Sequence, residues 1–258
     1  MNYTEKVNGL DCIYVLSGGM RKNDENIVVP GDFNTLDHHG LICEGKSRCQ
    51  AAAYLWQLNQ QIKLISSGKI LPFGYPELVE KAQYSRVYKQ ELVRLGVKPD
   101  SILESPLPND TFTELVSLVE FISKYNWQKV LVMCNRAQIE RTKVLLDVIR
   151  NYPLCKDLSD DFKISVKFFS NRLIYRKEQF LTPVFLAELT HFKLLNAQIE
   201  VIASEDVVEY FEPDKKDFFE EVYKTEGLIE RIKIEKSGID DILNGVYYIP
   251  KIIDQNTI

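Results

Sequence analysis

Residues 11–20 have the sequence DCIYVLSGGM, an apolar run that stops at Ser-Gly-Gly. An uncharged run of this length is typical of a strand buried on both faces, as in a parallel sheet. Gly18 and Gly19 carry no side chain where the chain must turn, so backbone N–H groups there can approach a ligand closely. We therefore expect Ser17, Gly18 and Gly19 to bind a ligand, although a tight turn with positive φ would favour the same glycines.

The composition predicts a globular, cytoplasmic protein. The chain has 258 residues, of which 45% are hydrophobic and 27% charged, and its net charge of −5 argues against non-specific nucleic-acid binding. No apolar run approaches the roughly 20 residues of a membrane span, and residues 1–9, MNYTEKVNG, lack the apolar core of a signal peptide. Five cysteines without a CxxC pair are typical of a reduced chain. The sequence leaves the oligomeric state open.

Strands and helices are predicted to alternate strictly over residues 11–150. We expect strands at residues 11–17, 61–66, 101–103 and 128–134, and helices at residues 47–59, 76–95, 110–124 and 138–150. This alternation predicts a parallel sheet covered by helices on both faces. Ser47 is the expected N-cap of the first of these helices, and the long segment 20–46 is expected to be a loop with a short extended piece at 27–29.

The predicted fold class is α/β, a Rossmann-like three-layer α/β/α sandwich with a mainly parallel sheet. We expect a single domain over residues 1–258, with a core at 11–150 and an extension at 151–258 that continues the sheet. Within the extension we expect strands at residues 162–168 and 198–202, a helix at 181–195 and a turn at 203–206. The charged segments 214–224 and 228–236 predict a solvated helical surface.

Four predicted strand ends carry small, polar or charged residues. Ligands bind at the carboxyl ends of the strands in a parallel α/β sheet, so this coincidence predicts a functional crevice there. The residues at these ends are Ser17, Gly18 and Gly19; Ser67, Gly68 and Lys69; Glu104, Asn109 and Thr111; and Cys134, Asn135 and Arg136.

Three cations are candidates for binding an anionic group. Arg48 lies at the start of a predicted helix, where the helix dipole disfavours a cation, so either a ligand or a salt bridge must account for it. Arg141 follows Gln138 by one helical turn and could clamp an anion bidentately or form a surface ion pair. Lys69, beside Gly68, could bind a phosphate or carboxylate or simply be exposed.

The carboxylates after residue 103 have different explanations. Thr111 and Glu114 fit the spacing of a capping box, which gives that pair a structural reason. Glu104 has no such reason and is the better candidate for an acid–base or ligand-orienting role, so it is the predicted catalytic residue. His38 and His39 lack identifiable partners, and we expect no metal site.

Taken in order, the motifs of residues 11–150 resemble the YdcF/SanA-like family, a domain of unknown function with a Rossmann-like α/β/α sandwich. The matching pieces are DCIYVLSGG, Arg48 with Ala52 and Leu55, LISSGK, a glutamate before LGV, ILES…NDTFTE and VLVMCNRAQIER. The residues that fall on the family's motif positions are Gly18, Gly19, Arg48, Ser67, Gly68, Glu91, Glu104, Asn109, Thr111, Glu114 and Arg141.

This sequence also departs from the family's pattern. Lys69 replaces a glycine, and Cys134 and Asn135 stand where threonine and serine are usual. Gln138 stands where the family has a histidine. An amide does not titrate, so Gln138 can hydrogen-bond a ligand but cannot perform acid–base chemistry that a histidine would perform.

The resemblance implies a small anionic or nucleotide-like ligand at the strand ends, with hydrolase or transferase activity as an option. Many relatives are membrane-anchored, whereas no anchor is recognisable in this sequence, and one branch is described as binding S-adenosylmethionine, which becomes a candidate ligand. The alternative is a non-catalytic regulatory or interaction protein, which the change at Gln138 favours. A third hypothesis is a PP-loop-type ATP pyrophosphatase, but residues 20–22, MRK, do not supply the Asp and Ser that this loop needs.

Overall fold

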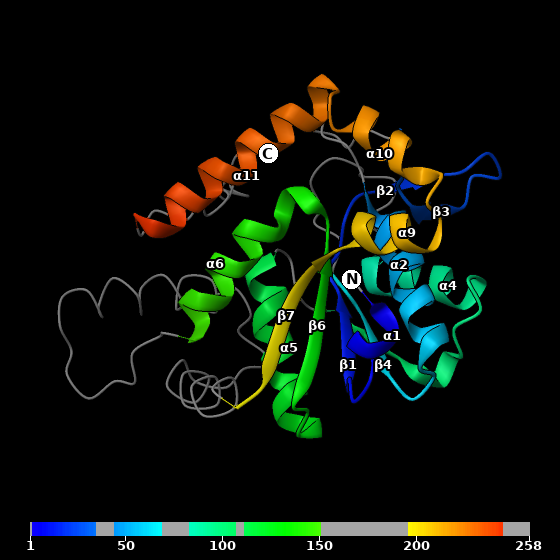
Figure 1. The fold of residues 1–258 in the computed structure, drawn as a ribbon, viewed down its shortest axis with the longest axis vertical. Helices are drawn as coiled ribbons and strands as arrows, with labels where there is room; N and C mark the ends of the chain where they lie inside the picture. The colour runs from blue at the N-terminus through cyan, green and yellow to red at the C-terminus, as the bar shows by residue number, and fades with distance from the viewer. Residues whose placement is uncertain (1, 35–43, 69–82, 107–110, 151–195, 245–258) are drawn as a thin grey trace, which may run out of the picture.

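The protein is described by a computed structural model over residues 2–34, 44–68, 83–106, 111–150 and 196–244, and all structural statements concern these residues. Five parallel strands form one sheet in the order β5-β4-β1-β6-β7 (Figure 1). The strands are β1 (Cys12–Val15), β4 (Lys63–Ser67), β5 (Ile102–Ser105), β6 (Lys129–Cys134) and β7 (Gln198–Ala203).

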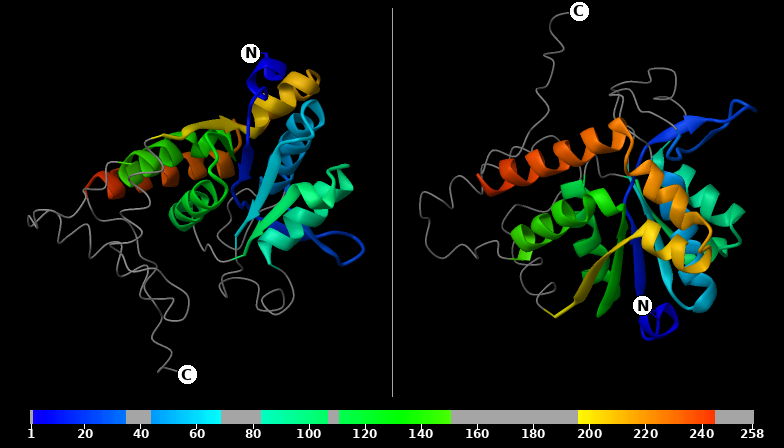
Figure 2. Two further views of the ribbon diagram at one scale, coloured as in Figure 1. Left: turned by 90° about the horizontal axis from the view of Figure 1, so that it is seen from below. Right: turned by 45° about the horizontal axis from the view of Figure 1, so that its top comes forward.

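Helices cover both faces of the sheet. The helices are α1 (Tyr3–Lys6), α2 (Gly45–Leu58), α4 (Tyr84–Arg94), α5 (Thr111–Tyr125), α6 (Ile139–Arg150), α9 (Ser204–Phe211), α10 (Lys215–Val222) and α11 (Glu226–Leu243), with short 3₁₀ turns η1 (Pro99–Ser101) and η2 (Arg136–Gln138). Ile13 and Val15 of β1 face a core shared with α1, α2, α4 and α9, whereas Cys12 and Tyr14 face α5 and α6 (Figure 2). The predicted three-layer Rossmann-like α/β/α fold is therefore confirmed.

The central strand has neighbours that explain its apolar sequence. All four residues of β1 are fully buried, because β4 and β6 flank it and helices cover both of its faces. The chain proceeds from β1 to β4 and β5 on one side, then returns to place β6 and β7 on the other. The carboxyl ends of β1 and β6 therefore flank the topological switch point, where doubly wound sheets bind ligands.

Two local predictions were wrong, and both concern the start of a helix. The helix predicted from Ser47 begins at Gly45 with Glu44 at the N-cap position, and Ser47 instead donates its hydroxyl to the backbone oxygen of Glu44 at 2.9 Å. The turn predicted at residues 203–206 is the start of α9. Ser204 and Glu205 are residue types that suit turns and helix N-termini equally, so their composition could not distinguish the two.

The segment 20–46 is not simply a loop. Strands β2 (Met20–Lys22) and β3 (Val28–Pro30) pair antiparallel as a hairpin, which bears out the short extended piece expected near residues 27–29. Asn26 has φ of 62°, a conformation that asparagine tolerates in tight reversals. Other expectations, namely the strand at 162–168, the helix at 181–195 and residues 76–82 of a helix, lie outside the described residues.

Helix α11 crosses the carboxyl edge of the sheet. Leu228, near its start, packs in the core with α2 and α9, whereas Ile242, near its end, packs in the core with α5 and α6. Figure 2 (right) brings this edge forward and shows α10 and α11 lying along it. The charged segments are helical, as predicted, but the surface is not wholly solvated, because Glu235 is only 2% exposed.

In the described part of the chain, none of the helices combines the length and the apolar character that crossing a membrane requires.

Candidate functional site

Arg48 lies at the centre of a buried polar cluster at the switch point. Its side chain, on the first turns of α2, is fully buried. Nη1 donates to the backbone oxygens of Leu16 at 3.0 Å and Ser17 at 2.6 Å. Nη2 donates to Oε1 of Gln138 at 2.8 Å and to Oδ1 of Asn135. Arg48 therefore ties the end of β1 to the segment after β6, which explains a cation at the start of a helix.

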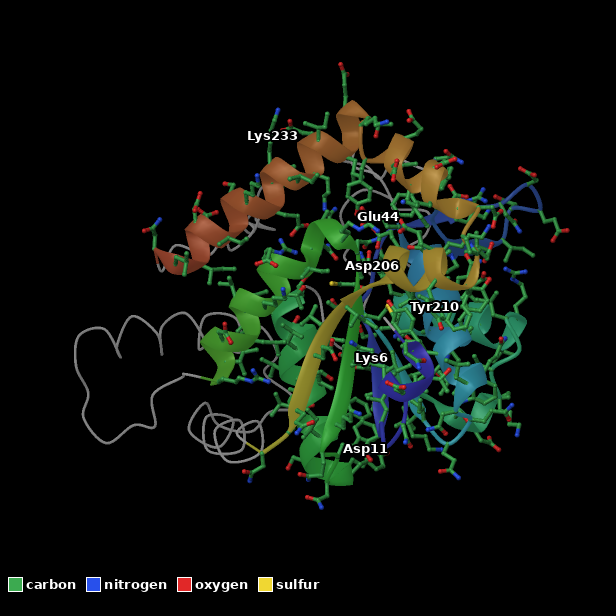
Figure 3. All side chains as sticks on the ribbon, viewed as in Figure 1. Lys6, Asp11, Glu44, Asp206, Tyr210 and Lys233 are labelled. Carbon is green, nitrogen blue, oxygen red and sulfur yellow. The ribbon has the colours of Figure 1, made fainter. Side chains whose placement is uncertain are left out.

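Glu44 completes the surroundings of this guanidinium group. Its Oε2 lies 3.4 Å from Arg48 Nη2, and Figure 3 labels Glu44 near the carboxyl edge, at the opposite end of the sheet from Asp11. Burial raises the pKa of the Glu44 carboxyl to about 7, although the positive charges of Arg231 and Arg48 lower it. Near neutral pH this group therefore exchanges between its neutral and charged forms.

Three buried polar atoms around the Arg48 guanidinium lack a partner among the described residues: Oε1 of Glu44, Nδ2 of Asn135 and Nε of Arg48 itself. The side chains of Glu44 and Asn135 are 2% and 0% exposed, and both contact Arg48 through their other polar atom. Buried polar atoms are nearly always hydrogen-bonded in folded proteins. A carboxyl group and an amide donor that contact the same guanidinium group are thus available at the switch point.

Helix α11 contributes a second layer to the cluster. Oε1 of Glu235 accepts hydrogen bonds from Arg231 at 2.7 Å and from Nε2 of Gln138 at 3.3 Å, and Oε2 lies 2.8 Å from Nε of Arg141. Arg141 also donates to Oγ1 of Thr111 at 3.0 Å. Gln138 therefore links Arg48 to Glu235, with its amide oxygen and nitrogen both in use. We call Glu44, Arg48, Asn135, Gln138, Arg141 and Glu235 the Arg48 cluster.

Glu114 holds the ends of two strands together. This buried residue of α5 accepts the N–H of Ser17 at 2.7 Å and the hydroxyl of Ser67. Burial raises the pKa of Glu114, although the hydrogen bonds from Ser67 and Ser17 lower it. Thr111 and Glu114, which have the spacing of a capping box, therefore bond to partners in other elements.

The glycines after β1 are tightly packed. The N–H of Gly18 donates to the hydroxyl of Tyr88 at 2.6 Å. A Cβ atom on Gly45 would lie 2.0 Å from that same hydroxyl oxygen, so the approach of α2 to α4 requires glycine there. Gly68 has φ of +107°, which also favours glycine. The N–H groups of Ser17 and Gly18 thus have protein partners in this structure.

A further buried carboxylate, Glu205, organises the end of β7. Glu205, fully buried at the start of α9, accepts the N–H of Arg136 at 3.1 Å, the hydroxyl of Ser204 at 3.0 Å and the hydroxyl of Tyr223 at 2.5 Å. Burial and the nearby charge of Glu205 raise the pKa of Tyr223 well above its ordinary range. Ser204 also lies 3.0 Å from the hydroxyl of Ser47, which connects this group to α2.

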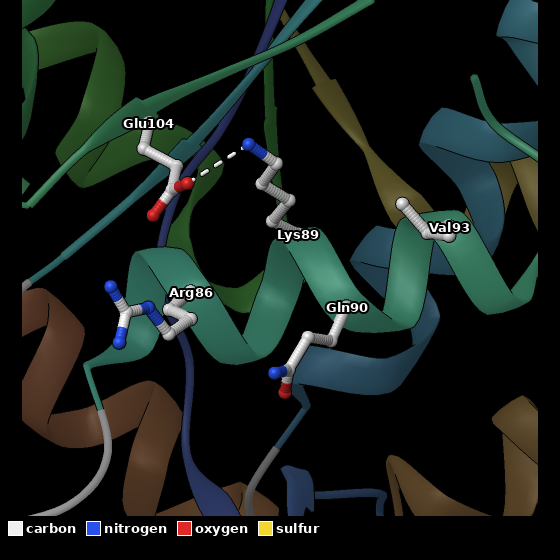
Figure 4. Close-up of a pocket in the computed structure, with 5 residues that line it drawn as sticks. All are labelled: Arg86, Lys89, Gln90, Val93 and Glu104. Carbon is white, nitrogen blue, oxygen red and sulfur yellow. Dashed lines mark hydrogen bonds and ion pairs between the residues drawn. The ribbon is translucent and has the colours of Figure 1, made fainter. Parts of the chain in front are cut away.

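Two predicted site residues lie apart from the Arg48 cluster. Glu104, on β5, pairs with Lys89 of α4 at 3.0 Å in an open depression of about 370 Å³ that Arg86, Gln90 and Val93 also line (Figure 4). Glu91 binds Arg94 on the same helix, at 2.6 and 2.8 Å. The catalytic role of Glu104 stays a prediction. Lys69 and Asn109 lie outside the described residues.

The structure adds residues that sequence reasoning missed: Glu44, Tyr88, Glu205, Arg231 and Glu235. The four-residue spacing of Arg231 and Glu235 was a usable signal, because such a pair lies on one side of a helix. Their highly charged surroundings favoured a solvated surface instead. The sequence carried no comparable signal for Tyr88 or Glu205.

The fold and the Arg48 cluster define a Rossmann-like α/β/α protein with a buried polar network at its switch point. Comparisons with known proteins add no family, since the chain matches no family model, no curated protein and no solved structure. Within the described ranges, no group of three or more His, Cys, Asp or Glu side chains has the arrangement of a metal site.

Proposed function

We propose that this protein binds a small anionic or nucleotide-like ligand at the carboxyl ends of β1 and β6, as its resemblance to the YdcF/SanA-like family implies. The observation that carries the proposal is that two buried side chains in contact with Arg48 each have a polar atom without a described partner, Glu44 Oε1 and Asn135 Nδ2. They lie where ligands bind in doubly wound sheets, and a ligand would satisfy both of them.

The charge distribution favours an anionic group on that ligand. Helix α2 has 14 residues, no acidic residue in its first turn and no side-chain hydrogen bond at its N-cap. The positive end of the helix dipole, which no acidic side chain of the first turn offsets, therefore favours an anion near the start of α2. Arg48 acts through the positions it imposes on Glu44 and Asn135, since its own Nη atoms are engaged with protein groups.

The second candidate is a non-catalytic regulatory or interaction protein with the same fold. Gln138 favours it, because the amide has both polar atoms in hydrogen bonds and cannot titrate. Hydrolase or transferase turnover of a bound ligand would argue against it. Binding without turnover would support it, since a binding module needs the same cluster but no acid–base residue at position 138.

A thermal-shift panel of nucleotides, S-adenosylmethionine, sugar phosphates and divalent metals tests the proposal. A ligand at about 100 times its dissociation constant adds roughly 2.7 kcal/mol to the free energy of unfolding. We expect a shift with an anionic ligand that Asn135→Ala abolishes. The control variant Asn244→Ala, at the exposed end of α11, should keep the shift. A panel without any shift would contradict the proposal and favour the interaction protein.

A further inference from the structure

We propose that Glu44 binds the anionic group of the ligand as a neutral carboxylic acid, donating a hydrogen bond from Oε1 beside Asn135 Nδ2, so that ligand binding takes up one proton. This inference rests on the proposed function and assigns the chemistry of its site. It also identifies Glu44 as the residue that makes binding depend on pH.

The geometry leaves one oxygen of Glu44 free for this role. Oε2 faces Arg48, whereas Oε1 is buried without a described partner. Other buried carboxylates of the region are saturated. Glu205 uses both oxygens for backbone and hydroxyl donors, and Glu235 uses both for Arg231, Gln138 and Arg141. Glu44 is therefore the carboxyl group of this network that is positioned to bind something new.

The charges around Glu44 come from three directions. Arg48 on α2 and Arg231 on α11 favour its ionised form, whereas Glu205 on α9 and Glu235 on α11 disfavour it. Tyr223, beside Glu205, is held neutral by burial and by that carboxylate. Burial outweighs the two arginines and raises the pKa of Glu44 to about 7, so a small further perturbation changes its charge near neutral pH.

An anion at this position supplies that perturbation. A negative charge within hydrogen-bonding distance of Oε1 raises the pKa of Glu44 further, because two like charges cannot both be held in a buried site. The protonated carboxyl group becomes a donor, as does the amide of Asn135, and both then point a hydrogen at the anion. The proton comes from solvent and remains on Glu44 while the ligand is bound.

Isothermal titration calorimetry with the full chain tests the linkage. Inorganic sulfate and cyclic AMP are suitable probes, since neither changes its charge between pH 6 and pH 9. We expect the affinity to be nearly constant below pH 7 and to fall about 100-fold from pH 6 to pH 9. Titrations at pH 8 in two buffers of different ionisation enthalpy should show the uptake of about one proton per bound ligand.

The variant Glu44→Gln separates the proton from the hydrogen bond. Its amide can donate at every pH, so binding should become independent of pH and release or take up no proton. Glu200→Gln is the matched control, because this exposed carboxylate on β7 pairs with Lys6 away from the cluster. The control should keep the pH dependence of the wild type. Circular dichroism at each pH verifies that all three proteins are folded.

The outcomes distinguish the inference from the proposed function. Wild-type binding that does not change with pH, or that weakens below pH 7, would overturn the role of Glu44 and leave the ligand site intact. A folded Glu44→Gln protein that binds neither probe would show that Glu44 acts as a charged acceptor instead. If neither probe binds the wild type at pH 6, the anionic ligand of the proposed function is itself wrong, and the inference with it.

Discussion

The Arg48 cluster and the depression beside α4 both combine cations with carboxylates near the carboxyl ends of strands, yet they differ in solvent access. In the cluster, the side chains of Arg48 and Glu44 are 0% and 2% exposed. In the depression, the side chains of Lys89 and Glu104 are 32% and 30% exposed. Solvent screens the charges of Lys89 and Glu104. The charges of Arg48 and Glu44 must instead be compensated by neighbouring groups of the protein.

This difference explains why residue type was a poor guide to the site. Glu104 was predicted as a carboxylate at a strand end and Arg48 as a cation misplaced at the start of a helix, and neither argument says anything of burial. A buried cation that loses its partners leaves uncompensated charge, but an exposed cation returns to water. Substitutions at the two places should therefore have effects of different size.

The largest effect is expected for Arg48→Ala. This change leaves Glu44 and two backbone oxygens without their donor, and we expect the free energy of unfolding to fall by about 3–5 kcal/mol at pH 7. Urea denaturation followed by circular dichroism measures it. A loss below about 1 kcal/mol, similar to that of an exposed pair, would mean that water enters the cluster and the comparison fails.

A second effect depends on pH and concerns Glu44→Gln. Burial raises the pKa of Glu44 from 4.5 to about 7 on folding, so the folded state keeps a proton that the unfolded state releases between these values. The contribution of this carboxyl group to the free energy of unfolding of the wild type is therefore greatest below pH 4.5, and it decreases as the pH rises to 7. The variant lacks the decrease, so its stability relative to the wild type should rise by about 3 kcal/mol over this range and then level off.

Urea denaturation at half-unit steps of pH measures this difference. Glu200→Gln again serves as the control, because this exposed carboxylate lies away from the cluster, and its stability relative to the wild type should stay flat through pH 6–7. If the difference in stability between Glu44→Gln and the wild type does not change with pH, the Glu44 carboxyl group is hydrated, like the exposed carboxyl group of Glu104.

An intermediate effect is expected for Glu235→Gln. The substitution weakens the contacts of α11 with Arg141 and Arg231, whose side chains are 16% and 18% exposed, and should destabilise the protein by about 1–3 kcal/mol. Amide hydrogen exchange of α11 should accelerate more than exchange of β1. Equal protection of α11 in the variant and the wild type would show that Leu228 and Ile242 hold the helix without the ion pairs.

The smallest effect is expected for Lys89→Ala. Its pair with Glu104 is about one-third exposed, so the loss of stability should stay below about 1 kcal/mol and shrink further in 1 M salt. Thermal unfolding at low and high salt measures it. A loss comparable to that of Arg48→Ala would remove the distinction between the two regions.

Local sequence patterns predicted most of the sheet and the helices beside it. The uncharged runs of β1 and β6 required burial on both faces, and alternation with helical segments required a parallel sheet. The errors arose where one residue type suits two structures. Ser204 and Glu205 fit either a turn or a helix start, and residues 20–46 were rich in turn-forming types although two short strands pair within them.

The candidate site was predictable in part. The predicted ligand-binding residues included Gly18, Arg48, Glu114, Asn135, Gln138 and Arg141. The structure joins Gly18 and Glu114 to the end of β1, and Arg48, Asn135, Gln138 and Arg141 to the Arg48 cluster. Glu44, Glu205 and Glu235 were not expected, because they fell in a predicted loop, a predicted turn and a charged helical segment, where carboxylates are ordinarily solvated. Their burial depends on α9 and α11, which come from the far end of the chain.

The sequence by itself determined the alternation of strands and helices, the parallel sheet and the polar character of its strand ends, because these follow from local periodicity and from residues adjacent in the chain. Tertiary structure decided which charged groups share one buried cluster. That choice depends on the path of α11 across the sheet edge, which brings Glu235 to Gln138 and Arg141 over about 95 residues of sequence. Burial, and the pKa of Glu44 that results from it, arises from the packed elements together.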